Sequence, residues 1–169
     1  MMDYFIKKCA LVAGMNVLDV GCGQGVALAA FTQRGFHPVG ITLNAIDRIA
    51  CHQQGYMVHE MDQSFLEFDD RTFDIVWCRH CLEHSVFPYF TLHEIFRVLK
   101  PQGALYIEVP APDTSSRHQS NPNHYSVMGK TMWAELIHRT GFELLDVADI
   151  NFQTMLGADT YWAFIQRKP

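Results

Sequence analysis

An acid followed by alternating glycines is the run of residues with the clearest capacity for chemistry. The run contains Asp19, Gly21, Cys22, Gly23 and Gly25. Apolar residues at 17–20 predict a buried strand before it, and those at 27–31 predict a helix after it. Glycines let the backbone turn sharply and approach a ligand closely. Because amide N–H groups and the helix dipole point into such a turn, the sequence predicts a ligand-binding cradle there.

The spacing of the glycines distinguishes two kinds of ligand. A dinucleotide-binding turn has two residues between its second and third glycines, and that position is Val26, which does not fit. The D-x-G-x-G-x-G arrangement at residues 19–25 instead resembles the first motif of class I S-adenosylmethionine-dependent methyltransferases, of the methyltransferase-11/UbiE-like branch. That ligand carries an ammonium, which suits an acid, and a carboxylate, which suits amide groups. A tight turn with no ligand is the alternative.

Two further segments extend the resemblance over residues 17–141. Residues 73–76 followed by Leu82-Glu83-His84 resemble the fourth-strand region of the family. Residues 94–103 resemble its common E-x-x-R-V-L-K-P-G-G segment, with Gln102 in place of one glycine. Three such pieces in this order imply the fold of the family.

The resemblance implies a set of residues that bind S-adenosylmethionine. Residues 19–25 would hold the amino-acid end of the donor, and Asp62 its adenine, with a backbone contact from Gln63. The chain at the end of the fourth strand would line the donor. The implied residues outside the glycine run are Thr42, Leu43, Asp62, Gln63, Cys78 and Arg79.

Thr42 is the clearest departure from the family pattern. The second strand usually ends in an acid that binds the ribose hydroxyls, and this sequence has Thr42 there. A neutral hydrogen bond nets about 0.5–1.5 kcal/mol, and one to a charged group about 1.5–3 kcal/mol. The expected loss is therefore about 1 kcal/mol, which weakens donor binding several-fold without excluding it.

Histidines near the ends of predicted strands are the candidates for the chemical step. A sulfonium methyl group is already activated, so a protein mainly supplies proximity and alignment. A hydroxyl acceptor also needs a proton acceptor, and His is the usual one near neutral pH. His84 follows the fourth strand, and His124 precedes the last helix beside Tyr125, so we take all three as catalytic candidates.

Residues 110–126 form a polar segment that is long for a connection. Such a loop at the functional edge of a sheet is often a lid or a substrate clamp. A merely solvated loop is the alternative. A zinc site at Cys78, Cys81 and His84 is a further alternative, but one C-x-x-C lacks the second pair that a structural zinc site needs. We therefore expect no metal.

Composition limits the number of domains, the kinds of partner and the cellular compartment that we expect. The 169 residues suffice for one domain, 1–169, and 13 basic against 18 acidic residues argue against binding along a nucleic-acid backbone. No apolar run reaches membrane-spanning length. The five cysteines have no framework spacing, which predicts a reducing compartment, the cytoplasm. Nothing in the residues indicates an oligomeric state.

The chain must place these residues on strands that alternate with helices. Strands are predicted at residues 17–20, 38–41, 56–59, 73–78, 104–109, 142–150 and 160–166. Helices are predicted at residues 3–13, 27–34, 44–54, 90–99 and 130–140, with a stop at residues 100–103. Nine residues between the last two strands are too few for a crossover, so these strands should be antiparallel.

The sequence thus predicts an α/β fold with a doubly wound, mostly parallel seven-stranded sheet. Its last strand is antiparallel, helices cover both faces, and a short N-terminal cap precedes it. The predicted function is transfer of a methyl group from S-adenosylmethionine to a small-molecule or sugar-like acceptor, at oxygen. A donor-binding module without catalysis, or one subunit of a methyltransferase complex, is the alternative, and a dinucleotide oxidoreductase is disfavoured by Val26.

Overall fold

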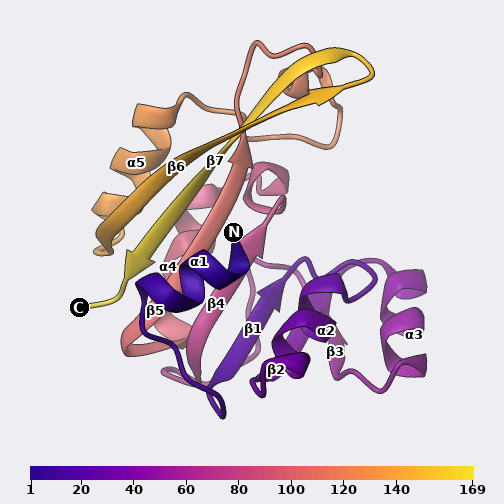
Figure 1. The fold of residues 1–169 in the computed structure, drawn as a ribbon, viewed down its shortest axis with the longest axis vertical. Helices are drawn as coiled ribbons and strands as arrows, with labels where there is room; N and C mark the ends of the chain where they lie inside the picture. Colours follow the sequence, from indigo (N-terminus) through magenta and orange to yellow (C-terminus); the bar gives the residue numbers. More distant parts are fainter.

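The computed structural model describes all 169 residues as one seven-stranded sheet with helices on both faces (Figure 1). The strands are β1 (Asn16–Val20), β2 (His37–Thr42), β3 (Val58–Glu60), β4 (Phe73–Arg79), β5 (Leu99–Pro110), β6 (Glu143–Thr154) and β7 (Gly157–Arg167). The helices are α1 (Met2–Lys8), α2 (Val26–Gln33), α3 (Ala45–Gln53), α4 (Pro88–Val98) and α5 (Lys130–Arg139). Two short 3₁₀ turns are η1 (Leu82–His84) and η2 (His118–Ser120).

The strand order is β3-β2-β1-β4-β5-β7-β6. Strands β1 to β5 are parallel, and β7 lies antiparallel between β5 and β6. The predicted α/β class, the mostly parallel sheet and its reversed last strand are confirmed. Because β1 lies at the point where the strand order reverses, its carboxyl end opens the crevice in which ligands of such sheets bind.

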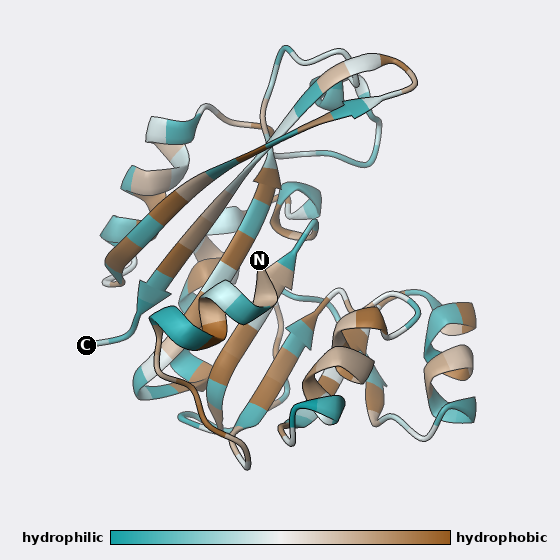
Figure 2. Cartoon of the chain, in the orientation of Figure 1, coloured by the Kyte–Doolittle hydropathy of each residue, from teal (hydrophilic) through white to brown (hydrophobic).

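Two apolar cores lie on opposite faces of the sheet. On one face, Phe5 of α1 and Phe31 of α2 pack on Trp77 and Tyr106, whose rings stack with centroids 3.9 Å apart. On the other, side chains of α4 and α5 pack on β4 and β5. Figure 2 shows the consequence, with hydrophobic strands inside and hydrophilic residues toward the helix surfaces and the upper loops. Burial on both faces explains the continuous apolar runs in the central strands.

The first helix is shorter than the sequence predicts. It ends at Lys8 instead of residue 13, and Ala10 has a left-handed backbone with φ 52°. The amide of Leu11 donates to the carbonyl of Ile6, which closes the helix end. The chain therefore turns before Gly14, toward the start of β1.

Residues 100–103, predicted as a stop, lie inside β5 instead. The register between β4 and β5 shifts there, and Gln102 has φ 63°, so the segment is a bulge in a continuing strand. A β-carbon on Gly103 would lie 2.8 Å from the carbonyl oxygen of Lys100, which requires glycine. Other boundaries move slightly: β3 begins at Val58, and α4 begins at Pro88, a favoured first helical residue.

The predicted loop between the last two strands is a hairpin. Strands β6 and β7 pair from Glu143 to a turn formed by residues 155 and 156 alone. Figure 1 shows this hairpin rising beyond the sheet beside the chain that links β5 to α5. Its far half leaves the core, so polar residues alternate with few apolar ones and look like a loop in the sequence.

Candidate functional site

The turn between β1 and α2 has the backbone that the glycine run predicts. Gly21, Gly23 and Gly25 have φ of 69°, 50° and 84°. A β-carbon on Gly21 would lie 2.5 Å from the sulfur of Cys81, whereas one on Gly23 would meet nothing within 4 Å. Gly21 is thus required by packing, and Gly23 leaves open space at the N-terminus of α2. Such a turn presents amide groups to a ligand.

Asp19 places an unpartnered carboxylate beside this turn. Its side chain is 3% exposed, and its Oδ2 atom has no hydrogen-bond partner. It lines a cleft of about 420 Å³ together with Gly21, Cys22 and Arg79. Burial raises the pKa of Asp19 to about 8, although the Arg79 guanidinium acts in the opposite direction. A buried acid without a partner fits a ligand that brings a cation, as the ammonium of S-adenosylmethionine would.

Arg79 belongs to a charged cluster at the ends of β4 and β5. Glu108 Oε1 accepts from Arg79 Nε at 2.9 Å and lies 2.6 Å from His80 Nε2, and the Tyr106 hydroxyl donates to the other carboxylate oxygen. Burial alone would raise the pKa of Glu108, but these partners hold it below its usual value. The cluster fixes Arg79, whose side chain is 52% exposed, at the edge of the cleft.

The remaining predicted donor-binding residues do not line this cleft; they are Thr42, Leu43, Asp62, Gln63 and Cys78. Thr42 ends β2 with its hydroxyl oxygen accepting from the amide of Asn44 at 3.1 Å, which leaves the hydroxyl hydrogen free. Leu43 is 67% exposed. Asp62 Oδ1 accepts from the amide of Ser64 at 2.7 Å and keeps one carboxylate oxygen free of such a bond. The roles of these residues stay predictions.

Gln63 joins the third strand's loop to the end of β4. Its side-chain nitrogen donates to the Cys81 carbonyl at 3.0 Å, and the Cys81 thiol donates to its oxygen at 3.3 Å. The Cys78 side chain is fully buried in the core under α4 and α5, so only its backbone can reach the crevice.

His84 and His124 come together although forty residues of sequence separate them. Their ring centroids are 4.7 Å apart, with the rings nearly perpendicular. His84 Nδ1 lies 2.8 Å from the carbonyl oxygen of Asn123, and His124 Nδ1 has no partner. Burial, and then the neighbouring rings of His84 and His118, lower the pKa of His124. Tyr125, the third candidate, is 64% exposed.

Glu83 completes this group, although it was not predicted as a functional residue from the sequence. It is 1% exposed, its Oε2 atom has no partner, and burial raises its pKa to about 7. One ligand-type atom from each of Glu83, His84 and His124 lies within 4.8 Å of the others. Three such atoms can share protons or hold a divalent cation. The thiols of Cys78 and Cys81 gather no comparable set.

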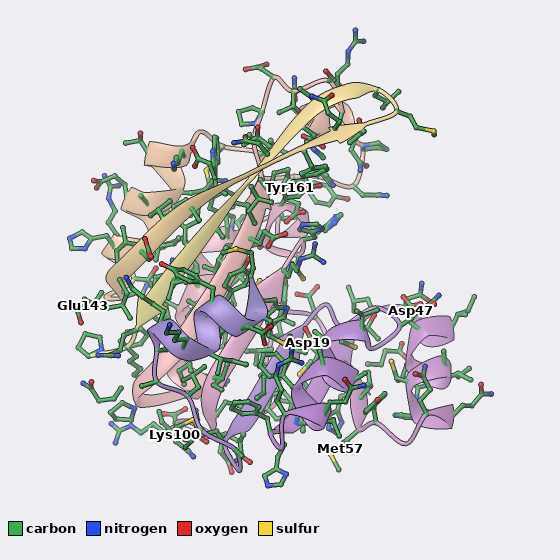
Figure 3. The ribbon with its side chains drawn as sticks, viewed as in Figure 1. Asp19, Asp47, Met57, Lys100, Glu143 and Tyr161 are labelled. Atoms are coloured by element: carbon green, nitrogen blue, oxygen red, sulfur yellow. The ribbon has the colours of Figure 1, made fainter.

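Contacts link the cradle to the histidines. Cys81, which packs on Gly21, precedes η1 and accepts from the amide of His84 at 3.0 Å. Figure 3 labels Asp19 at the top of β1 and Tyr161 on β7, where the hairpin leaves the sheet. Glu108 and Asp159 were also not predicted as functional residues from the sequence. An acid within the apolar run 104–109 was a usable signal for Glu108, whereas Asp159 had none.

No helix of the chain is long and apolar enough to cross a bilayer.

A family model described as a methyltransferase domain matches residues 2–147. The ubiquinone biosynthesis O-methyltransferase of Aeromonas salmonicida is 27% identical over 134 residues, 75% of this chain and 53% of that protein. That of Pseudomonas paraeruginosa is 30% identical over 144 residues, 80% of this chain and 59% of that protein. The chain spans about half the length of the curated relatives it matches.

Solved structures share the fold. The 4+2 cyclase SpnF superposes with a TM-score of 0.84 at 21% identity, over 99% of this chain and 79% of that one. A SAM-dependent methyltransferase from Archaeoglobus fulgidus superposes with a TM-score of 0.81 at 19% identity, over 99% and 91%. With the glycine cradle and the family match, these findings show that the chain belongs to the class I methyltransferase domain family, whose methyl donor is S-adenosylmethionine.

Proposed function

We propose that this chain transfers a methyl group from S-adenosylmethionine to a hydroxyl oxygen of a small molecule. One observation carries the proposal: the unpartnered carboxylate of Asp19 lines a glycine-rich cleft, and Cys81 connects that cleft to the paired rings of His84 and His124. The cleft would hold the donor, and the histidines would receive the proton of the acceptor.

The bound donor supplies a methyl group on a positively charged sulfur. An acceptor oxygen attacks this carbon in line, so the O–C bond forms while the C–S bond breaks and its electron pair stays on sulfur. The hydroxyl proton passes to an imidazole nitrogen of the pair. His124 suits this role because its lowered pKa keeps the ring neutral near pH 7 and its Nδ1 atom has no partner. Asp19, Arg79 and the turn amides would align the donor.

An oxygen acceptor is supported by the relatives and by the chain itself. The relatives named above are O-methyltransferases, and a hydroxyl acceptor requires the proton acceptor that the histidine pair can provide. The net charge of −5 favours a small molecule over nucleic acid.

A donor-binding module without catalysis is the second candidate. SpnF shares this fold and is described as a cyclase, so the fold itself does not imply methyl transfer. The neutral Thr42 at the ribose position would weaken donor binding, which suits a subunit that needs a partner.

Two experiments test the proposal. Calorimetry with S-adenosylmethionine, its demethylated product and NAD should show heat for the first two ligands only; no heat with the donor at millimolar levels would refute both candidates. Mass spectrometry should then detect transfer of a labelled methyl group to a metabolite of a cell extract.

The variant His84→Ala/His124→Ala should lose transfer but keep donor binding, whereas the exposed control pair His37→Ala/His138→Ala should keep both. Equal turnover in both variants would refute the assignment of the base.

A further inference from the structure

We infer that Asp159 and His118 are positioning residues that hold His124 in place for the methyl transfer. Neither would touch the reacting atoms. The inference rests on the proposed function, but the contacts that carry it lie elsewhere in the chain, where the hairpin formed by β6 and β7 meets the segment 110–126. It assigns a function to the far half of that hairpin, which contributes little to the core.

The carboxylate of Asp159 is the centre of a buried hydrogen-bond group. The side chain is 3% exposed. Its oxygens lie 3.0 and 3.1 Å from His118 Nε2, and they accept from Ser116 Oγ at 2.7 Å and from the amide of Thr160 at 2.8 Å. Burial alone would raise the pKa of Asp159, but these bonds hold it below its usual value. A buried carboxylate with this many donors has few free orientations, so it is a rigid anchor for His118.

His118 connects the carboxylate of Asp159 to the pair formed by His84 and His124. It is 8% exposed, and its ring lies parallel to that of His124 with centroids 5.7 Å apart. The edge of the Tyr161 ring packs on His118 at 5.2 Å. The ring of His124 is therefore in contact with the rings of both His118 and His84. The Nδ1 atom of His124 is buried and has no hydrogen-bond partner.

The loop that carries both histidines is tied down at its two ends. Near its start, the amides of Ala111 and Ser115 donate to carbonyls of Thr160 and Ala158 in β7. Near its end, the amide of Ser126 donates to the carbonyl of Glu83 at 3.0 Å. The segment 110–126 thus bridges the hairpin and η1, and Figure 1 shows the chain that follows β5 running beside the hairpin. These bonds hold the segment against the rest of the fold, and its role as a lid or substrate clamp stays a prediction.

The expected consequence is a loss of alignment without a loss of donor affinity. None of the hydrogen bonds and ring contacts of Asp159 and His118 reaches the cradle residues between β1 and α2. Misplacing a catalytic group by about 1 Å can cost on the order of 100-fold in rate. Replacing Asp159 should therefore lower kcat strongly and leave the Kd for the donor unchanged.

The variant Asp159→Asn tests the inference, because asparagine keeps the shape and removes the charge. Asp149→Asn is the matched control, since Asp149 lies on the same hairpin but forms an exposed ion pair with Lys130. We expect at least a tenfold lower kcat for Asp159→Asn, with a donor Kd within twofold of wild type, and a wild-type kcat for the control. Ser116→Ala, which removes one hydrogen bond to the same carboxylate, should give a smaller loss in the same direction.

Histidine ring signals in NMR give a readout that needs no acceptor. In Asp159→Asn the signals of His118 and His124 should shift, and the titration midpoint of His124, which faces Glu83 and His84 from η1 and His118 from η2, should change. Unchanged signals and an unchanged kcat in a folded variant would overturn the inference. If wild type transfers no methyl group while the signals still move, the proposed function fails but the positioning contact stands.

Discussion

Gly21 and Cys81 lie so close that a β-carbon on Gly21 would come within 2.5 Å of the Cys81 sulfur. This contact joins the turn after β1 to the residue that precedes η1. The donor cradle and the histidine pair are therefore coupled by direct packing, and a change in either residue should affect both.

The variant Gly21→Ala should impair the protein through both packing and backbone strain. The methyl group would collide with Cys81, and alanine at φ 69° is strained. We expect a loss of roughly 1–3 kcal/mol of unfolding free energy and a clear loss of donor affinity, measured by denaturant unfolding and calorimetry. Gly23→Ala is the control for packing, because Gly23 also has a left-handed backbone with φ 50° but its β-carbon would meet nothing within 4 Å. It should lose less unfolding free energy than Gly21→Ala, and equal losses of unfolding free energy would contradict the packing argument.

Donor binding should release a proton at neutral pH. Asp19 has a pKa of about 8 in the free protein, and a bound ammonium would require its ionised form. Donor affinity should therefore weaken as pH falls below about 8. Well below that pH, Asp19 is protonated in the free protein and releases one proton for each donor bound, so the affinity should fall by up to about tenfold per pH unit. Calorimetry in buffers of different ionisation enthalpy measures the released proton directly. A proton count near zero at pH 7 would show that Asp19 does not hold the ammonium.

The variant Glu83→Gln should stabilise the free protein at alkaline pH. Burial raises the pKa of Glu83 from 4.5 to about 7, so the folded state binds more protons than the unfolded chain between these values. Stability must then fall as pH rises through that window. Thermal unfolding at pH 8.5 should show a higher Tm for Glu83→Gln than for wild type, with little difference at pH 4.5. Glu135→Gln, on the exposed face of α5, should change neither value.

The variant Thr42→Asp should tighten donor binding several-fold. A carboxylate at the end of β2 would accept charge-assisted hydrogen bonds from the ribose hydroxyls, worth on the order of 1 kcal/mol more than a neutral hydroxyl. Thr42→Val, which also loses the oxygen that accepts from the Asn44 amide, should weaken binding. Calorimetry with S-adenosylmethionine compares the two variants. Tighter binding by Thr42→Val than by Thr42→Asp would place the ribose elsewhere.

The effect of divalent cations on turnover distinguishes proton transfer from cation binding at Glu83, His84 and His124. If these side chains handle a proton, then treatment with EDTA followed by Mg²⁺, Mn²⁺ or Zn²⁺ should change turnover by less than about twofold. The measurement is the rate of labelled methyl transfer. A loss with EDTA that one of these ions reverses would assign the three side chains to a cation instead.

Local patterns made most of the cradle predictable. The acid, the glycines and the flanking apolar residues of 17–31 encode a strand, a turn and a helix within one short stretch, so no distant contact is needed to recognise them. Loop length also predicted the antiparallel pair at the end of the chain, because a crossover has a minimum length.

Pairing between distant segments made the rest unpredictable. Asp159 lies forty-one residues from His118, and the far half of its hairpin looks like a loop because that half leaves the core. Glu83 gave no sign of its raised pKa, since burial depends on what packs above η1. The chain leaves α1 at Lys8 and Ala10 has a left-handed backbone. Alanine rarely adopts this conformation, so the sequence did not predict the early end of the helix.

The two-residue turn at 155 and 156 gives this molecule a convenient place for a spectroscopic label. Met155 is fully open to solvent at the extremity of the hairpin, whereas all five native thiols are buried. A cysteine introduced by Met155→Cys would therefore react with a maleimide dye far ahead of the others. Its fluorescence would follow, in real time, whether the arm formed by the last two strands moves when an acceptor arrives.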